Sequence, residues 1–291
     1  MVDSLVVGVD GSDAGFRALD WAADEAALHE VPLRLVYASR WERYEGTVLA
    51  PSLARPTEEA LADNIVGAAA ERAGLRHADL GISTQVLGDD PETVLLREGQ
   101  DAFAVVVGSR GRGAFTGLLL GSVGLAVAAR ARCPVIVVRG DRAGREGTHG
   151  RILLGIGDAA EGSEAVRFAF REAQARGCTL DAVRTWRCPA HETADHPLLA
   201  GAPERYHENR ASALLDERLA EETGRHPAVR VRRFTVEGAA HKVLTHRSAA
   251  ADLLVIGAQR RQSPVGFQLG RTAHTALHHA ECPVAVVPQP A

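Results

Sequence analysis

The chain has 291 residues, of which 46% are hydrophobic and 24% charged, and its net charge is −4. This composition is typical of a globular protein and excludes a disordered or fibrous chain. The length predicts two domains, each large enough to bury a core of its own. Because acidic and basic residues nearly balance, the chain has no overall positive field, and we expect no nucleic-acid partner.

The cysteines and the first residues both favour a cytoplasmic protein. The four cysteines form no C-x-x-C pair, and the N-terminal segment has neither a basic region nor a long apolar run. We therefore expect reduced thiols, no secretory leader and a cytoplasmic location. The longest uncharged stretch, Gly113 to Ala129, contains several glycines, so we expect a loop followed by a buried helix, and no membrane partner.

The first half alternates short β-branched runs with longer segments of helical period. The predicted strands are residues 5–9, 33–38, 82–87, 103–107 and 134–138, and the predicted helices are 18–26, about 57–77, one from Pro91 and one after Gly121. This alternation predicts an α/β fold with a five-stranded parallel, doubly wound sheet and helices on both faces. In such a sheet a ligand binds beyond the carboxyl ends of the strands, here between the first and the fourth.

The second half repeats the first. Residues 33–39, 105–111 and 131–138 resemble residues 179–186, 254–260 and 280–287 at a nearly constant offset of about 148 residues. The stretch between the two copies is polar and rich in glycine, as linkers are. We therefore predict two tandem α/β domains, over residues 1–140 and 151–291, joined by a linker at 141–150.

Two turns of the first copy suit a phosphate ligand. The fourth strand runs into Gly108-Ser-Arg-Gly111, where glycines let the backbone take positive φ and let amide groups approach an anion. The next helix starts near Gly121, and its first amides carry a partial positive charge. There Ser122 either donates its hydroxyl to a phosphate oxygen or serves as the N-cap.

The first strand ends in Val9-Asp10-Gly11-Ser12, where the Asp10 carboxylate suits an adenine amine or a ribose hydroxyl. Together with Gly108-x2-Gly111-x9-Gly121-Ser122, this segment resembles the ATP-binding signature of the universal stress protein family. The resemblance extends over nearly the whole chain, as two tandem domains. It implies a Rossmann-like fold of the adenine nucleotide alpha hydrolase type that binds ATP, with Mg²⁺ on the phosphates, with little or no turnover, and that acts in the stress response.

The resemblance also implies which residues contact the nucleotide. Asp10 and Val36 would lie near the adenine, Val107, Gly108, Arg110 and Gly111 along the ribose and phosphates, and Gly121, Ser122 and Val123 at the phosphate end. Val9, Gly11 and Ser12, beside Asp10, are expected to belong to the same binding site. Gly124 stands where the family often has a hydroxyl residue, so one phosphate contact is expected to be missing.

The second copy departs from the signature. It reads Gly257-Ala-Gln-Arg260 and then Gly270-Arg271, so arginines replace a glycine and the serine. Gly157 takes the place of Asp10, or Asp158 does after a slip of one residue. Two interpretations stay open: this half has lost ATP and serves a structural role, or Arg260 and Arg271 hold a different anionic ligand.

The sequence favours a nucleotide-binding regulatory module over an enzyme. It contains no S-G-G-x-D-S, H-x-G-H or G-x-x-x-x-G-K-[ST] motif, and we assign no catalytic residue. A slow ATPase, for which Asp13 and Arg112 are the nearest candidates, and a scaffold without nucleotide stay open as alternatives. We also expect the two halves to pair as an internal pseudo-dimer. A homodimer and an unknown regulatory protein partner stay open.

The remaining conspicuous residues have structural interpretations. His274 and His278 share one helix face, but a metal would require a third ligand, so we expect no metal site. We expect Cys133 and Cys282 to be small buried side chains and Trp21 to be part of the core. The motif at 191–196 misses the spacing of a zinc protease and is predicted to be a loop. The long segments 41–56 and 188–203 are predicted to be lids or partner loops.

Overall fold

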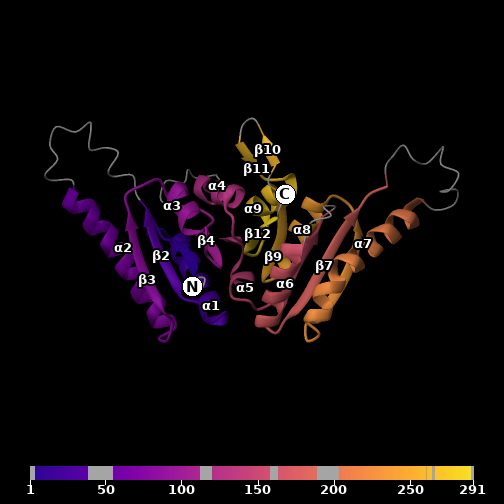
Figure 1. The fold of residues 1–291 in the computed structure, drawn as a ribbon, viewed down its shortest axis with the longest axis horizontal. Coiled ribbons are helices and arrows are strands. Elements are labelled where there is room, and N and C mark those ends of the chain that lie inside the picture. The colour runs from indigo at the N-terminus through magenta and orange to yellow at the C-terminus, as the bar shows by residue number, and fades with distance from the viewer. Residues whose placement is uncertain are drawn as a thin grey trace. The chain divides into compact units, whose positions relative to one another are not determined.

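The computed structural model describes residues 4–38, 55–111, 120–157, 163–188, 203–259, 261–263 and 266–289. The chain divides into two units, residues 1–139 and 140–291. Each unit is an α/β domain built on a parallel sheet (Figure 1). The fold class predicted from the alternation of strands and helices is therefore confirmed.

Five strands of the N-terminal unit are hydrogen-bonded in the order β3-β2-β1-β4-β5. They are β1 (Leu5–Gly8), β2 (Leu33–Ala38), β3 (Ile82–Leu87), β4 (Ala104–Gly108) and β5 (Val135–Val138). Leu5 of β1 lies opposite Leu33 on one side and Ala104 on the other, and both pairings are parallel. The chain thus leaves β1 in one direction for β2 and β3 and returns on the other side for β4, so the strand order reverses between β1 and β4, as predicted.

Helices cover both faces of this sheet. They are α1 (Asp13–Leu28), α2 (Arg55–Arg76), α3 (Pro91–Glu98) and α4 (Ser122–Arg130). Among the described residues, α1 and α2 pack on each other and on one face, while α3 and α4 pack together on the other face. This double cover explains why β5 is buried along its whole length and reads as a continuous apolar run.

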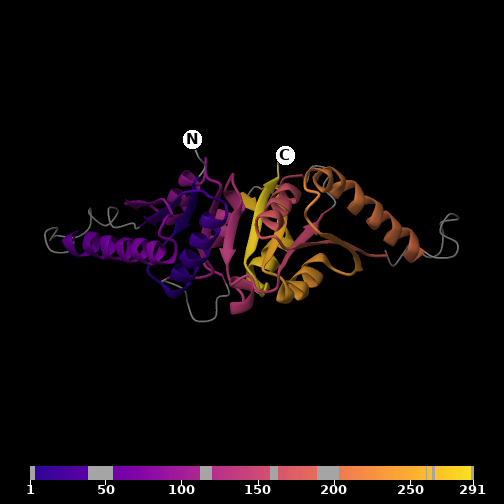
Figure 2. The same cartoon turned by 90° about the horizontal axis from the view of Figure 1, so that it is seen from below.

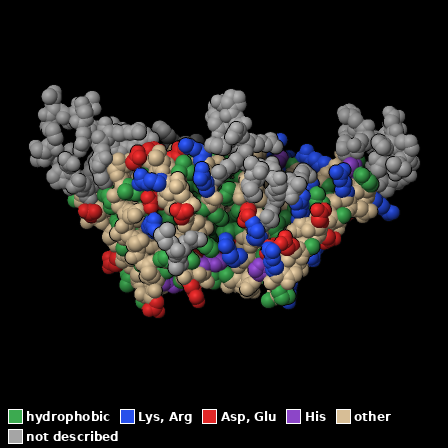
Figure 3. Space-filling model, viewed as in Figure 1, with side chains coloured by type: hydrophobic (Ala, Val, Ile, Leu, Met, Phe, Trp, Pro, Cys, Tyr) green, Lys and Arg blue, Asp and Glu red, His purple; other side chains and the backbone are tan. Residues whose placement is uncertain are grey.

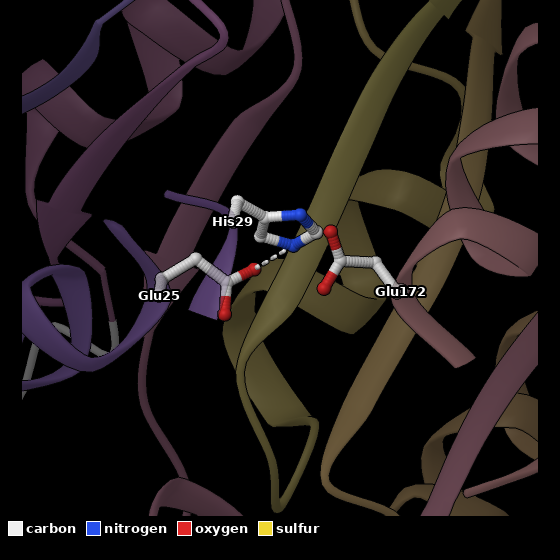
Figure 4. Close-up of side chains that lie close together, drawn as sticks. All are labelled: Glu25, His29 and Glu172. Atoms are coloured by element: carbon white, nitrogen blue, oxygen red, sulfur yellow. Dashed lines mark ion pairs between the residues drawn. The ribbon is translucent and has the colours of Figure 1, made fainter. Parts of the chain in front are cut away.

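The α1 helix begins at Ser12, whose hydroxyl accepts a hydrogen bond from the amide of Gly15 at 3.0 Å. Its inward face is lined by small and apolar residues, and Trp21 is buried there, as predicted. Near its C-terminus the same helix buries a polar pair. The Nε2 atom of His29 lies 3.6 Å from Oε1 of Glu25 in an i, i+4 ion pair, which Figure 4 shows as a dashed line. The His29 ring also packs on Phe103, with 4.8 Å between ring centroids.

Two bidentate ion pairs join α1 to α2. Arg72 binds Asp20 and Arg76 binds Asp24, each through two hydrogen bonds of 2.5–2.6 Å. His77 adds a third contact to Asp24 at 2.8 Å. Burial by itself would raise the pKa of Asp24, but the hydrogen bonds from Arg76 and His77 outweigh it and lower the pKa below the ordinary value of 3.8.

A pH dependence of stability follows from this shift. The pKa of Asp24 is lower in the folded than in the unfolded chain, so its contribution is present above pH 3.8 and is lost as the pH falls below that value. We expect the melting temperature of an Asp24→Asn variant to fall less than that of the native protein between about pH 4 and pH 2. Thermal melts followed by circular dichroism across that range test this. Parallel losses in the two proteins would contradict it.

The C-terminal unit repeats the same architecture, with strands in the order β12-β9-β6-β7-β8. Its strands are β6 (Arg151–Ile156), β7 (Thr179–Trp186), β8 (Val231–Glu237), β9 (Leu253–Gln259) and β12 (Val284–Gln289), and its longer helices are α6 (Ser163–Ala175), α7 (Pro203–Arg225), α8 (Ala240–Arg247) and α9 (Arg271–His279). Helices α6 and α7 pack together on one face, and α8 and α9 pack together on the other. In Figure 2 the long helix α7 lies above the strands of this unit and α8 lies below them.

One feature of this unit was not expected from the repeat. A two-stranded antiparallel hairpin, β10 (Arg261–Ser263) and β11 (Gly266–Gln268), follows β9, and Arg261 lies opposite Gln268. The repeat has no strand signal at this place, because each of the two strands is only three residues long. The hairpin stands directly before α9.

The segment predicted as a linker contains regular structure. It holds the single-turn helix α5 (Arg142–Arg145), which Asp141 caps by accepting a hydrogen bond from the amide of Gly144 at 2.8 Å. The Asp141 amide in turn donates to the Glu281 carbonyl at 3.0 Å. Further on, the buried carboxylate of Asp252 accepts hydrogen bonds from the amides of His149 and Arg151, at 2.8 and 2.9 Å. These contacts attach residues 141–151 to the C-terminal unit.

Among the helices in the described part of the chain, none is both long enough and apolar enough to cross a bilayer. The uncharged stretch from Gly113 to Ala129 is helical from Ser122 onward, as part of α4, and residues 112–119 lie outside the described part of the chain.

Candidate functional site

A cavity of about 490 Å³ opens at the carboxyl ends of β1, β2 and β4 in the N-terminal unit. Ten of the twelve predicted site residues line it: Val9, Asp10, Val36, Val107, Gly108, Arg110, Gly111, Gly121, Ser122 and Val123. The cavity lies where the strand order reverses between β1 and β4, and the start of α4 forms its far wall. The structure thus brings together residues from four separate segments of the chain.

Gly11 and Ser12, the other two predicted residues, are not part of the cavity lining. Gly11 has a positive φ of +74° and turns the chain between β1 and α1. The hydroxyl of Ser12 is used at the N-terminus of α1, where it accepts from Gly15. Both residues thus shape the start of α1, and their contact with a ligand stays a prediction.

Asp10 joins that helix start to the cavity. Its Oδ1 atom accepts hydrogen bonds from the amide and the hydroxyl of Ser12, at 3.0 and 2.6 Å. A Cβ atom on Gly111 would stand 2.8 Å from the other carboxylate oxygen, Oδ2. The carboxylate is therefore held in one orientation between the two turns that the sequence singled out, and it borders the cavity from there.

The reason for the glycines at the β4 turn differs from the prediction. Neither Gly108 nor Gly111 has a positive φ. Instead, a Cβ atom on Gly108 would lie 2.7 Å from the carbonyl oxygen of Ala14, and one on Gly111 would meet Asp10. Glycine is therefore required at these positions because the β4 turn approaches the start of α1 closely, and not because the backbone takes a positive φ.

The start of α4 excludes one of the two roles that the sequence left open for Ser122. Gly121 is the N-cap, with extended φ and ψ of −73° and 152° and no capping side-chain hydrogen bond, so Ser122 is not the N-cap. The amide of Gly121 donates to the Ser109 carbonyl at 2.9 Å, which ties the two glycine-containing segments together. Ser122 is exposed at the cavity and stands in the first turn, where a helix has amide groups without intrahelical acceptors.

Several apolar lining residues were missed by the sequence analysis. They are Ala38, Pro91, Leu95 and Leu120, together with the small residues Gly8 and Gly15. Pro91 and Leu95 come from the first turns of α3, which packs on the same face as α4. The sequence did contain a signal for Pro91 and Leu95, because the predicted order of helices already put α3 and α4 at the same edge of the sheet.

The C-terminal unit does not reproduce this lining at the corresponding places. The side chain of the buried Gln289 lies within 3.0–3.3 Å of the Cβ position of Gly257, the counterpart of Gly108. Gly157 is exposed, with no atom within 4 Å of its Cβ position. Arg271 is the first residue of α9. Asp158 and Arg260 lie outside the described residues, so their predicted roles stay predictions.

The other conspicuous residues behave as structural ones where they are described. Cys133 and Cys282 are buried, as predicted, and burial raises the pKa of Cys178 to about 11. His274 is exposed and stacks on His278 with 4.5 Å between ring centroids. In the described part of the chain, the α9 histidines belong to no group of three metal-ligating side chains. The motif at 191–196, Arg112, and nearly all of the predicted lids at 41–56 and 188–203 lie outside the described residues.

Comparisons with known proteins agree with this architecture. The chain matches the universal stress protein family over residues 1–139 and again over 148–288. A curated universal stress protein of Mycobacterium tuberculosis is 31% identical, over 98% of this chain and 97% of its own length. The crystal structure of a universal stress protein from Archaeoglobus fulgidus has the same fold, with a TM-score of 0.72, 18% identity and 98% of each chain covered.

A shorter universal stress protein, solved in complex with cAMP, covers 47% of this chain with 28% identity and a TM-score of 0.37, and 96% of its own chain is matched. The two family matches and the tandem relative together confirm the resemblance drawn from the glycine signature. The chain belongs to the universal stress protein family, as a tandem member with two copies of the domain.

Proposed function

We propose that the N-terminal unit binds ATP and acts as a nucleotide-dependent regulatory module of the stress response, with little or no turnover. The observation that carries this proposal is the convergence of ten signature residues on one cavity at the strand-order reversal. A cavity of about 490 Å³ lies within the size range of small-molecule sites. The proposal places the protein in the cytoplasm, where ATP is abundant and its thiols stay reduced.

The cavity has an apolar part that suits an adenine ring. Val36 and Ala38 at the end of β2 and Leu95 of α3 line it. Val36 is 1% and Leu95 is 4% exposed, so both positions are fixed by the surrounding core. A planar base placed there would bury its faces against aliphatic side chains. Asp10 is the carboxylate among the lining residues, and it would accept from an amine or a ribose hydroxyl.

The opposite part of the cavity suits phosphates. Gly108 and Gly111 expose backbone where a Cβ atom would be in the way, and the first turn of α4 supplies amide groups and the positive end of the helix dipole. Arg110 adds a full positive charge from an exposed position. These donors fit a polyphosphate. Mg²⁺, which takes oxygen ligands, would be held by the phosphates and by water.

The experiment that tests the proposal is a direct inventory of bound nucleotide. Purified protein is denatured, and the released nucleotide is identified and counted by mass spectrometry, while the stripped protein is titrated with ATP in a calorimeter. About one ATP per chain, recovered unchanged, supports the proposal. ADP accumulating during incubation would favour the slow ATPase instead. Absence of nucleotide and of any heat of binding would favour the scaffold.

A substitution at Gly124 should strengthen ATP binding. A Cβ atom there would find its nearest neighbours at 3.6–3.7 Å, which is ordinary packing distance, so a side chain fits. Gly124→Ser would place a hydroxyl in the first turn of α4, beside the proposed phosphates. Since a hydrogen bond to a charged group contributes about 1.5–3 kcal/mol, we expect ATP to bind about tenfold more tightly.

Gly124→Ala is the matched control for this variant. Alanine adds the same Cβ atom and removes the same helix-interior glycine, but it supplies no hydroxyl. Titration calorimetry should show tighter binding for serine and affinity close to native for alanine. Equal affinity in the two variants would mean that position 124 does not face the phosphates.

A further inference from the structure

The C-terminal unit contains a second cavity, of about 630 Å³, whose chemistry differs from that of the first. It lies at the carboxyl end of β7, between α7 and the starts of α8 and α9. Six of its lining residues are basic: Arg184, Arg187, His207, Arg210, His241 and Arg271. The lining, as far as the structure describes it, contains no Asp or Glu. Figure 3 shows Lys and Arg side chains, with His beside them, along the upper edge of this unit.

Regular structure holds these basic groups around one space. Arg184 lies near the carboxyl end of β7, and its Nη1 atom donates to the Ile156 carbonyl at 3.1 Å. His207 and Arg210 are three residues apart on α7 and so lie on one helix face. These two side chains thus border the cavity from α7, whereas Arg184 borders it from β7. The positive charge is thus distributed around the space rather than placed at one point.

Two helix starts complete the wall. The amide of Gly238 donates to the Trp186 carbonyl at 2.9 Å and holds the start of α8 against the end of β7. Neither Ala239, the N-cap of α8, nor Gly270, the N-cap of α9, makes a capping side-chain hydrogen bond. Ala240 in the first turn of α8 and Arg271 in the first turn of α9 line the cavity, so the positive ends of both helix dipoles lie at its edge.

The electrostatic effect is visible on His241. Burial lowers the pKa of this imidazole, and the charges of Arg271, Lys242 and Arg187 lower it further. Among the described residues, the three charged groups that shift its pKa are all cations. By contrast, Arg232 on the neighbouring strand β8 pairs with Asp181. A ligand that carries several negative charges would relieve the repulsion that the cavity residues exert on one another.

We propose that this cavity binds a small phosphorylated molecule with two or more phosphate groups, at a site separate from that of the N-terminal unit. Arginine suits such a ligand, because its planar fork pairs with two phosphate oxygens at once. Charges supplied from β7, α7 and α9 match phosphates that are separated in space. Trp186 in the same lining offers an aromatic face to the rest of the molecule. The sequence left open that Arg271 of the second copy holds an anionic ligand other than ATP, and this proposal develops that interpretation.

The inference does not depend on ATP binding by the first unit. It is tested on the full-length chain by titration calorimetry with inorganic tripolyphosphate at physiological ionic strength. Arg210 and Arg271 are both exposed at the cavity edge, so Arg210→Gln and Arg271→Gln remove charge without opening a hole in the core. We expect each to weaken binding at least about tenfold and the double variant to abolish it. Arg230→Gln is the matched control, since Arg230 is exposed before the first residue of β8, at the opposite edge of the sheet, and should bind like the native protein.

The same titration in a Gly111→Val background separates this site from the first one. Tripolyphosphate binding that survives Gly111→Val but is lost in the arginine double variant supports the inference. It is overturned by binding that disappears with Gly111→Val alone, by binding that ignores both arginine substitutions, or by no detectable heat. A single-stranded RNA that binds more tightly than tripolyphosphate, and responds to the same arginines, would also overturn it in favour of nucleic acid.

Discussion

Replacing Gly111 with valine should abolish ATP binding while leaving the fold intact. The first atom of any side chain at this position would stand 2.8 Å from Oδ2 of Asp10, closer than non-bonded atoms approach. Asp10 cannot move without breaking its hydrogen bonds to Ser12. The branches of valine would then extend into the space proposed for the phosphates. We expect the affinity for ATP to fall more than about 100-fold, which corresponds to about 2.7 kcal/mol.

Two further variants make this test specific. Gly111→Ala adds only the Cβ atom and should cause an intermediate loss, because Asp10 alone has to shift. Gly67→Val introduces the same bulk on α2, at an exposed position with no atom within 4 Å of its Cβ position, and should bind ATP normally. Calorimetry gives the affinities, and far-UV circular dichroism reports the fold. Unchanged affinity in Gly111→Val would refute the assignment of this turn to the ligand.

Replacing Asp252 with alanine should cause a large loss of stability. Its side chain is 3% exposed, and it accepts hydrogen bonds from the amides of His149 and Arg151. Alanine would leave both amides without this acceptor at the start of β6. Since an unsatisfied buried donor costs about 1–3 kcal/mol, we expect the free energy of unfolding to fall by about 3 kcal/mol.

Asp216→Ala is the matched control for this prediction. Asp216 is an exposed aspartate of the same unit, paired with Arg233 at 3.0 Å, and exposed ion pairs contribute at most about 1 kcal/mol. Urea unfolding of the two variants, with a probe in the C-terminal unit, measures the difference. Similar unfolding midpoints would show that the Asp252 hydrogen bonds contribute little beyond those of a surface carboxylate.

Much of the fold could be predicted because its signals are local. The segments Leu33–Ala38 and Ile82–Leu87, which are rich in apolar and β-branched residues, are strands with the predicted bounds, and Pro91 begins α3 as its fixed φ favours. The reversal of strand order between β1 and β4 then follows from the handedness of crossover connections. The β10–β11 hairpin escaped prediction because three-residue polar strands carry no hydrophobic period.

The candidate site was predictable where it depends on glycine spacing and not where it depends on tertiary contacts. The turns at Asp10 and Gly111 could be recognised from the sequence, but their contact with each other could not. The interpretation of Gly108 in terms of positive φ failed for the same reason, because its close neighbour is Ala14, on another segment of the chain. The basic cavity near Arg271 was equally hidden, since its arginines are distant in sequence.

The position of the first cavity within a single unit has a consequence for the lifetime of the protein. Every residue described in its lining lies between Gly8 and Gly124. A ligand there would stabilise the unit that it contacts, by about 2.7 kcal/mol at one hundred times its dissociation constant. Proteases in a cell degrade chains through transiently opened states. The cellular ATP level would therefore decide how long one half of this chain resists degradation, so that the abundance of the protein could itself record energy supply.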